Sequence, residues 1–102
     1  MKRSVVLTKT AQHRLKSLLI HLEMDWSLHV KERFIEQLNE RIELIRQNPE
    51  LYPKSNLKIG LHKCVVSKQT SLYYRHDSKT VTVLTIFDNR QDPDKLSSEI
   101  EE

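Results

Sequence analysis

The sequence predicts a single α+β domain, residues 1–102, in which an antiparallel helical hairpin packs on one face of an antiparallel sheet. Two stretches with helical spacing of apolar residues come first, and three short strand-like runs joined by short turns follow them. A run rich in β-branched residues at the N-terminus, Ser4 to Thr8, supplies one further strand.

The first helix is expected directly after this N-terminal strand. Thr8 or Thr10 can cap its start, and it should end near Trp26. We interpret Trp26 as a packing cap at the turn of the hairpin, because a tryptophan there more often packs than binds. Its apolar residues recur at helical spacing and include Ala11, Leu15, Leu18, Leu19 and Leu22.

The second helix begins after Ser27, which can act as its cap, and ends at Asn48-Pro49 because proline cannot continue a helix. Its apolar residues form a stripe along one face: Val30, Phe34, Leu38, Ile42 and Ile45. Two helices with one apolar stripe each form a hairpin that must pack on another layer.

The three strand-like runs are Leu61–Ser67, Ser71–His76 and Thr80–Phe87, and their short connections predict an antiparallel meander. The last run is apolar on both faces, so we expect it to be central, with the N-terminal strand beside it. The helical hairpin should leave the opposite face of the sheet partly open. Along that last run, residues are expected to alternate strictly, with Val81, Val83, Thr85 and Phe87 on one face and Thr82, Leu84 and Ile86 on the other.

The C-terminal segment begins with a turn-rich stretch, and one or two helical turns are expected from Asp94 to Ile100. The acidic residues Glu99, Glu101 and Glu102 are expected to be frayed.

Composition excludes several classes of protein. The apolar run Val5–Leu7 is too short for a signal peptide, and no stretch is long enough to span a membrane, so a cytoplasmic location without membrane contact is expected. The single cysteine, Cys64, cannot form an internal disulfide, which fits a reducing compartment, and we interpret it as a small buried hydrophobe. No cofactor is expected.

Histidines are present, but no pair has the i,i+4 spacing of a metal site, so no bound metal is expected. His62 and His76 could act as an acid/base pair, since histidine titrates near neutral pH. The preferred interpretation is that both are exposed histidines on strands.

The charge pattern is more informative than the net charge of +3. The span from Leu51 to His76 has no Asp or Glu and contains five basic residues: Lys54, Lys58, Lys63, Lys68 and Arg75. This span is either a solvated strand edge, where lysine discourages aggregation, or a basic face for an anionic partner, nucleic acid or an acidic peptide. Composition alone leaves both interpretations open.

Four segments in the right order resemble the RelE/ParE toxin superfamily, and the resemblance covers nearly the whole chain. They are Val6–Ala11, Ile45–Pro53, Leu72–Arg75 and Leu84–Leu96. The resemblance implies the toxin of a type II toxin–antitoxin pair, neutralised by a cognate antitoxin encoded beside it, and a role in plasmid stabilisation. It implies contact with operator DNA only through the antitoxin.

The superfamily contains two activities, and the resemblance is nearer to the ParE-like members, which inhibit DNA gyrase and cleave no bond themselves. RelE-like members cut mRNA on the ribosome and typically carry an Arg near the start of the middle strand and a Tyr or His in the tail. Here Ser71 falls where that Arg would be, and the tail after Arg90 has neither Tyr nor His. We therefore expect a protein-binding inhibitor; the alternatives are a RelE-like endoribonuclease and an inactive relative that only binds its antitoxin.

The candidate site residues follow from this interpretation. Weak catalytic candidates are Arg75, Arg90 and His62, should the chain be an enzyme. Arg90 has an alternative structural role, which is to bridge Asp88 or Asp92 and hold the tail in place. Tyr73 and Tyr74 should face opposite sides of their strand, one in the core and one at the surface. The residues expected to contact the target or the antitoxin are Lys58, Lys63, Lys68, Tyr73, Arg75 and Arg90.

Overall fold

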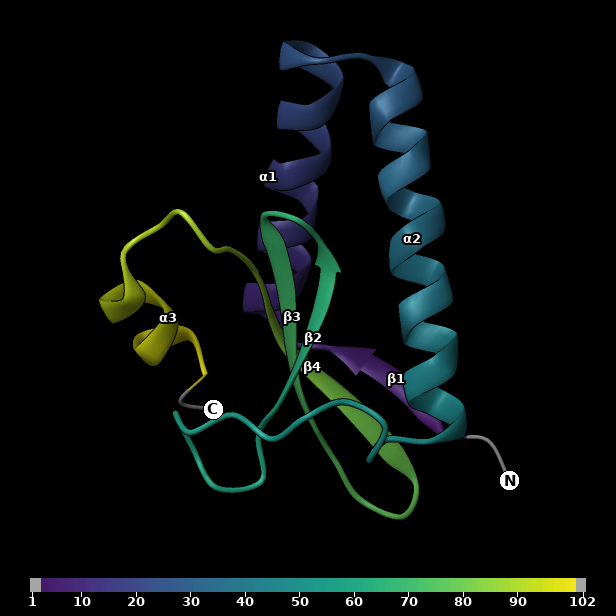
Figure 1. The fold of residues 1–102 in the computed structure, drawn as a ribbon, viewed down its shortest axis with the longest axis vertical. Coiled ribbons are helices and arrows are strands. Elements are labelled where there is room, and N and C mark those ends of the chain that lie inside the picture. The colour runs from purple at the N-terminus through teal and green to yellow at the C-terminus, as the bar shows by residue number, and fades with distance from the viewer. Residues whose placement is uncertain (1–2, 101–102) are drawn as a thin grey trace.

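The structure, a computed structural model, describes residues 3–100 and confirms the predicted order of elements (Figure 1). Met1, Lys2, Glu101 and Glu102 lie outside the described residues. None of the described helices is long and apolar enough to cross a bilayer. The elements are β1 (Ser4–Leu7), α1 (Lys9–Asp25), α2 (Leu28–Gln47), β2 (His62–Ser67), β3 (Thr70–His76), β4 (Thr80–Asp88) and α3 (Pro93–Glu99).

The four strands form one mixed sheet in the order β1-β4-β3-β2. The meander of β2, β3 and β4 is antiparallel as predicted, and β1 lies beside β4 as predicted. The expectation of a purely antiparallel sheet was wrong, because β1 runs parallel to β4. A tight turn forces neighbouring strands to be antiparallel, but the whole helical hairpin and two strands separate β1 from β4, so no turn constrains their direction.

Both helix caps of the hairpin are the residues expected from the sequence. Of the two threonines considered, Thr8 caps α1, with its hydroxyl accepting from the N–H of Ala11 at 3.1 Å. The Ser27 hydroxyl caps α2 by accepting from the N–H of Val30 at 3.1 Å. The Thr8 side chain also donates to the carbonyl of Leu84 at 2.9 Å, so the start of α1 is fixed directly to the central strand.

The main core lies between the helical hairpin and one face of the sheet. Its largest fully buried side chains include Tyr74, Ile45 and Leu72, and Cys64 is fully buried among them. Burial raises the pKa of the Cys64 thiol, so this side chain stays protonated and acts as the small hydrophobe that was predicted.

A β-bulge in β4 overturns the strict alternation expected for that strand. Tyr73 is opposite Thr85 and Tyr74 is opposite Val83, so Leu84 is an extra residue in β4. The bulge changes the phase of the strand: Val81, Val83 and Ile86 all belong to the main core. Leu84 and Phe87 belong to a second cluster on the opposite face.

That second cluster covers the face of the sheet that was expected to be partly open. α3 lies across the sheet from α2 (Figure 1) and contributes Leu96 and Ile100 to a cluster with Leu61, Tyr73, Leu84 and Phe87. Tyr73 and Tyr74 are therefore both buried, Tyr73 beneath α3 and Tyr74 in the main core, and the expectation that one would lie at the surface was wrong.

The C-terminal helix is also held by polar contacts, so Glu99 is not frayed. The Arg14 guanidinium of α1 forms an ion pair with the Glu99 carboxylate, and the Thr85 hydroxyl of β4 donates to the same carboxylate at 2.7 Å. Glu101 and Glu102, which were also expected to be frayed, lie outside the described residues. α3 therefore begins at Pro93, one residue before its predicted start, and is anchored to both α1 and β4.

Replacing Tyr74 by Phe tests the hydrogen bond at the end of the core. The Tyr74 hydroxyl donates to the carbonyl of the buried Pro49 at 2.7 Å, so Tyr74→Phe leaves a buried acceptor unpaired. We expect the free energy of unfolding to fall by about 1–2 kcal/mol in urea titrations. Tyr73→Phe is the matched control, because the Tyr73 hydroxyl has no hydrogen bond with the described residues, and it should change the free energy by under about 0.5 kcal/mol. Equal losses in both variants would contradict this assignment.

Replacing Glu99 by Gln tests the anchor of α3. Gln cannot form the ion pair with Arg14, so amide hydrogen exchange in residues 93–100 should accelerate by roughly tenfold while exchange in β3 stays slow. Lys95→Gln, a neutralising change at an exposed position of the same helix, serves as the control and should leave these rates unchanged. Unchanged exchange in Glu99→Gln would mean that the apolar contacts alone hold α3.

Candidate functional site: an apolar groove with a cationic rim

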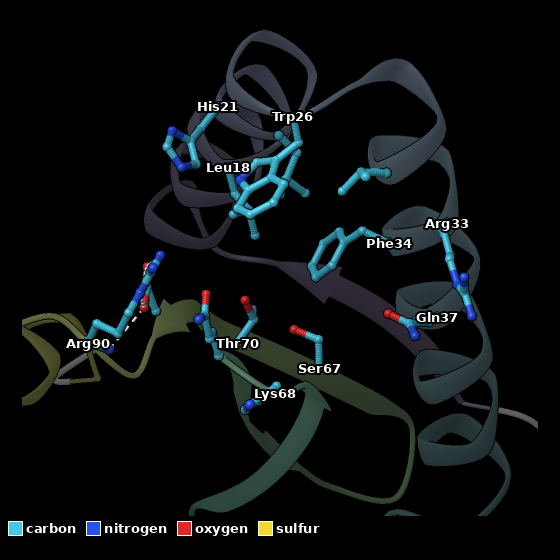
Figure 2. A pocket seen from close by; sticks show the side chains of 14 residues that line it. Leu18, His21, Trp26, Arg33, Phe34, Gln37, Ser67, Lys68, Thr70 and Arg90 are labelled. Atoms are coloured by element: carbon cyan, nitrogen blue, oxygen red, sulfur yellow. Dashed lines mark hydrogen bonds and ion pairs between the residues drawn. The ribbon is translucent and has the colours of Figure 1, made fainter.

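A groove of about 360 Å³ lies between the distal half of the helical hairpin and the turn that joins β2 to β3 (Figure 2). Its apolar wall is made by one face of the hairpin: Leu18, Leu22, Trp26, Val30 and Phe34. The opposite wall is polar and comes from Ser67 to Thr70 of the sheet. Arg33 lies at one side of the opening and Arg90 at the other.

The groove exists because α2 is longer than β2, the edge strand on which it packs. The 20 residues of α2 span about 30 Å, whereas the six residues of β2 span about 20 Å. The lower part of the apolar stripe on α2, Leu38 and Ile45, is buried in the core, and its continuation at Val30 is only half-buried. The hairpin thus extends past the sheet with part of its apolar face uncovered.

Trp26 is the clearest example of an uncovered apolar side chain on the hairpin. Its side chain is 70% exposed at the wall of the groove, so the interpretation of Trp26 as a packing cap was wrong. Ile20, Met24 and Leu28 near the same tip are also at least half exposed. Large apolar side chains gathered at one end of a small protein are typical of a surface that another protein covers.

The rim of the groove is mainly positive. Arg33, Lys68 and Arg90 are exposed cations around one half-buried carboxylate, Asp88. Arg90 donates to Asp88 through its side chain at 2.7 Å and through its backbone N–H at 2.9 Å, so Arg90 has the bridging role considered from the sequence. The hydrogen bond from Arg90 lowers the pKa of Asp88, which therefore stays charged and holds Arg90 at the edge of the groove.

Only two of the predicted contact residues, Lys68 and Arg90, line this groove. Lys58 donates to the carbonyl of Ile100 at 3.3 Å, and the Lys63 ammonium lies 6.0 Å from the centre of the Tyr73 ring, so both lie beside the face that α3 covers. Tyr73 is only 4% exposed and could reach a partner only if α3 moved.

Arg75 lies away from both groups. It is exposed near the end of β3 and pairs in register with Thr82, close to the turn between β3 and β4. The predicted residues therefore divide among three places on the molecule. The sequence analysis missed most of the groove wall, because Leu18, Leu22 and Phe34 have the same helical spacing as core residues.

The two strand histidines are not exposed as expected. His62 is only 2% exposed, its ring is stacked on Tyr74 with centroids 5.1 Å apart, and its Nδ1 lies 2.8 Å from the carbonyl oxygen of Tyr52. His76 is half-buried, and its Nε2 lies 3.1 Å from a carboxylate oxygen of Glu50. A substrate could not reach the His62 ring directly, so its candidacy as a catalytic residue has no support from its position.

The sequence contained one usable signal that His62 and His76 lie close together. His62 pairs in register with Tyr74 across the β2–β3 hairpin, and His76 lies two residues beyond Tyr74, so both histidines can be placed together once the register is known. Glu50 gave no such signal, because it lies in the loop before β2 and no periodic pattern fixes its position.

Comparisons with known proteins agree with the architecture. A family model described as the ParE toxin of the type II toxin–antitoxin system parDE matches residues 5–93. A search of curated proteins finds no match.

Solved structures with the same fold include toxins from three bacteria. The chromosomal ParDE toxin–antitoxin system of P. aeruginosa gives a TM-score of 0.72 at 15% identity, covering 85% of this chain and 96% of that one. The YoeB/ParE toxin of Agrobacterium tumefaciens gives 0.62 at 14% identity, covering 83% and 96%. The DinJ–YafQ toxin–antitoxin complex of E. coli gives 0.64 at 12% identity, covering 86% and 93%.

These structural likenesses establish the fold, and the family model, which spans most of the chain, establishes the family. The chain belongs to the ParE toxin family of type II toxin–antitoxin systems, within the RelE/ParE superfamily.

Proposed function

We propose that this toxin arrests growth by binding DNA gyrase, cleaves no bond itself, and is neutralised by an antitoxin that occupies the groove. The observation that supports binding without cleavage is that apolar residues of α3 cover the second face of the sheet. The family match to ParE toxins supports the same target class.

Cleavage of RNA through its ribose 2′-OH needs a group that accepts the proton, positive charge for the phosphorane-like transition state and an acid for the leaving oxygen. Here the tail packs Leu96 and Ile100 against the sheet and contains neither Tyr nor His, so it supplies no acid/base side chain of the RelE-like kind. Ser71, at the position expected for the RelE-like Arg, is fully buried. These features favour a binding surface over a ribonuclease centre.

The groove suits an antitoxin segment that is amphipathic and acidic. The apolar wall around Trp26 and Phe34 matches the apolar face of such a segment, and the cations Arg33 and Lys68 match its acidic residues. A helix-in-groove arrangement of this kind would bury Trp26, which is exposed in the free chain and is of the residue type that most often dominates binding energy. Toxin–antitoxin complexes among the structures with the same fold support an antitoxin partner. A cytoplasmic location, where gyrase works, is part of this proposal.

Inducing the toxin in cells without its antitoxin separates the two activities of the superfamily. Inhibition of gyrase predicts accumulation of gyrase-linked double-strand DNA breaks while mRNA stays intact, which pulsed-field gels and primer extension can score together. An induction control with an empty vector gives the background. Cleavage of mRNA at codon positions without DNA breaks would overturn the proposal in favour of the ribonuclease alternative. Normal growth would indicate an inactive relative.

Substitutions in the groove test the antitoxin contact. Trp26→Ser removes an exposed aromatic side chain that the fold does not need, so the protein should fold and its affinity for the product of the neighbouring reading frame should fall by at least about tenfold. Lys68→Glu should weaken binding and reduce its salt dependence. Affinity can be measured by calorimetry on purified proteins.

The matched control is Lys79→Glu, which makes the same charge reversal in the exposed turn between β3 and β4, outside the groove. It should leave antitoxin affinity unchanged. Should Trp26→Ser bind antitoxin normally but lose toxicity, the groove is a contact for the target instead of the antitoxin.

A further inference from the structure

We propose that Glu50, His62 and His76 form a binding site for a divalent transition-metal ion of the zinc class. One ligand atom from each of these three side chains lies within 4.8 Å of the other two. Two imidazole nitrogens and one carboxylate oxygen are a ligand set that zinc takes in proteins, with a further position left for water. This site lies outside the groove, and the inference does not depend on the target of the toxin.

His62 is already held in the form that a metal ligand requires. A carbonyl oxygen can only accept a hydrogen bond, so the contact of 2.8 Å to Tyr52 places the proton on Nδ1 of His62. The lone pair is then on Nε2, which lies 3.9 Å from the nearer oxygen of Glu50. Histidines that bind metals almost always donate their other N–H to a carbonyl or carboxylate in this way.

His76 completes the cluster from the neighbouring strand. Its Nε2 lies 3.1 Å from one Glu50 oxygen, while His62 faces the other oxygen of the same carboxylate. The two histidine rings are 5.3 Å apart and tilted by 47°, so their nitrogens can point at a shared ion without stacking on each other. Because the Glu50 carboxylate accepts, its contact with His76 places a proton on Nε2 of His76 when no ion is bound, and an ion bound there would displace that proton. Nδ1 of His76 is buried and has no hydrogen bond with the described residues.

The backbone around Glu50 is fixed on both sides. The Tyr74 hydroxyl donates to the carbonyl of Pro49, and the His62 ring donates to the carbonyl of Tyr52. The Glu50 side chain itself is 61% exposed, so it can turn toward an ion that enters from solvent. Metal–ligand bonds of about 2.0–2.1 Å require ligand atoms roughly 3.3 Å apart. Rotation of Glu50 can adjust its distances of 3.1 and 3.9 Å to the two histidines, and the histidine rings would have to shift to adjust the distance between their own nitrogens.

The ligand types select among ions. Imidazole nitrogen suits zinc and its transition-metal neighbours, whereas magnesium and calcium prefer oxygen ligands alone. A bound ion would join the loop after α2 to β2 and β3, because Glu50 lies in that loop and each histidine lies on one of the strands. Binding should therefore raise the stability of the folded chain. The proposed zinc site differs from the expectation that no metal binds. That expectation considered only histidine pairs spaced four residues apart along a helix.

The test is a titration of the full chain, stripped with EDTA and then exchanged into chelator-free buffer, with zinc chloride. We expect one equivalent to bind by calorimetry and the thermal midpoint to rise with zinc concentration, while magnesium chloride has no effect. Glu50→Gln and His76→Gln change side chains that are not fully buried, so both variants should fold, and each should weaken zinc binding by at least about tenfold.

His21→Gln is the matched control. His21 forms an exposed pair with Asp25 at 2.6 Å, so it offers zinc a histidine and a carboxylate at a site away from the cluster. Zinc binding that survives both cluster variants but is lost in His21→Gln would overturn the proposal. So would the absence of binding to the parent chain, which would leave Glu50 as a hydrogen-bond acceptor for His76 alone.

Discussion

The structure depends on β4, a central strand that pairs with β1 and β3 and is buried on both faces. Its partner on one side, β1, is followed at once by Thr8, whose backbone N–H donates to Val83 and whose hydroxyl donates to Leu84. The same hydroxyl caps α1. One threonine therefore sets where the helical hairpin starts relative to the centre of the sheet, and the position of the hairpin in turn determines where its uncovered tip lies.

Most of the fold could be predicted, because local patterns specify it. Ser27 and Asn48-Pro49 define the limits of α2, and short turns define the meander. What could not be predicted depends on pairing between distant segments. The parallel direction of β1 follows from no local signal, and the bulge at Leu84 appears only when β4 is laid against β3. The seal by α3 also depends on a contact across the chain, between Arg14 and Glu99.

The candidate site was less predictable than the fold for a related reason. The pattern of charges in the sequence predicted Lys68 and Arg90, which lie at the rim of the groove. The apolar wall has the same spacing as core residues, and the difference in length between α2 and β2 leaves Trp26 and Val30 uncovered. The histidine cluster was hidden in the same way, because His62 and His76 meet only through the register of the hairpin.

The extra residue in β4 has a consequence for how sequences of this kind can vary. Upstream of Leu84 the odd-numbered residues face the helices, and downstream the even-numbered Ile86 does. β4 thus contributes side chains to two hydrophobic layers, one on each face of the sheet. Deleting Leu84 would restore regular alternation from Val83 through Thr85 and Ile86 to Phe87, so Phe87 would stay on its face, but the layer beneath α3 would lose one apolar side chain. We therefore expect homologues without this extra residue to pair β3 and β4 regularly and to fill the space beneath α3 with another apolar side chain.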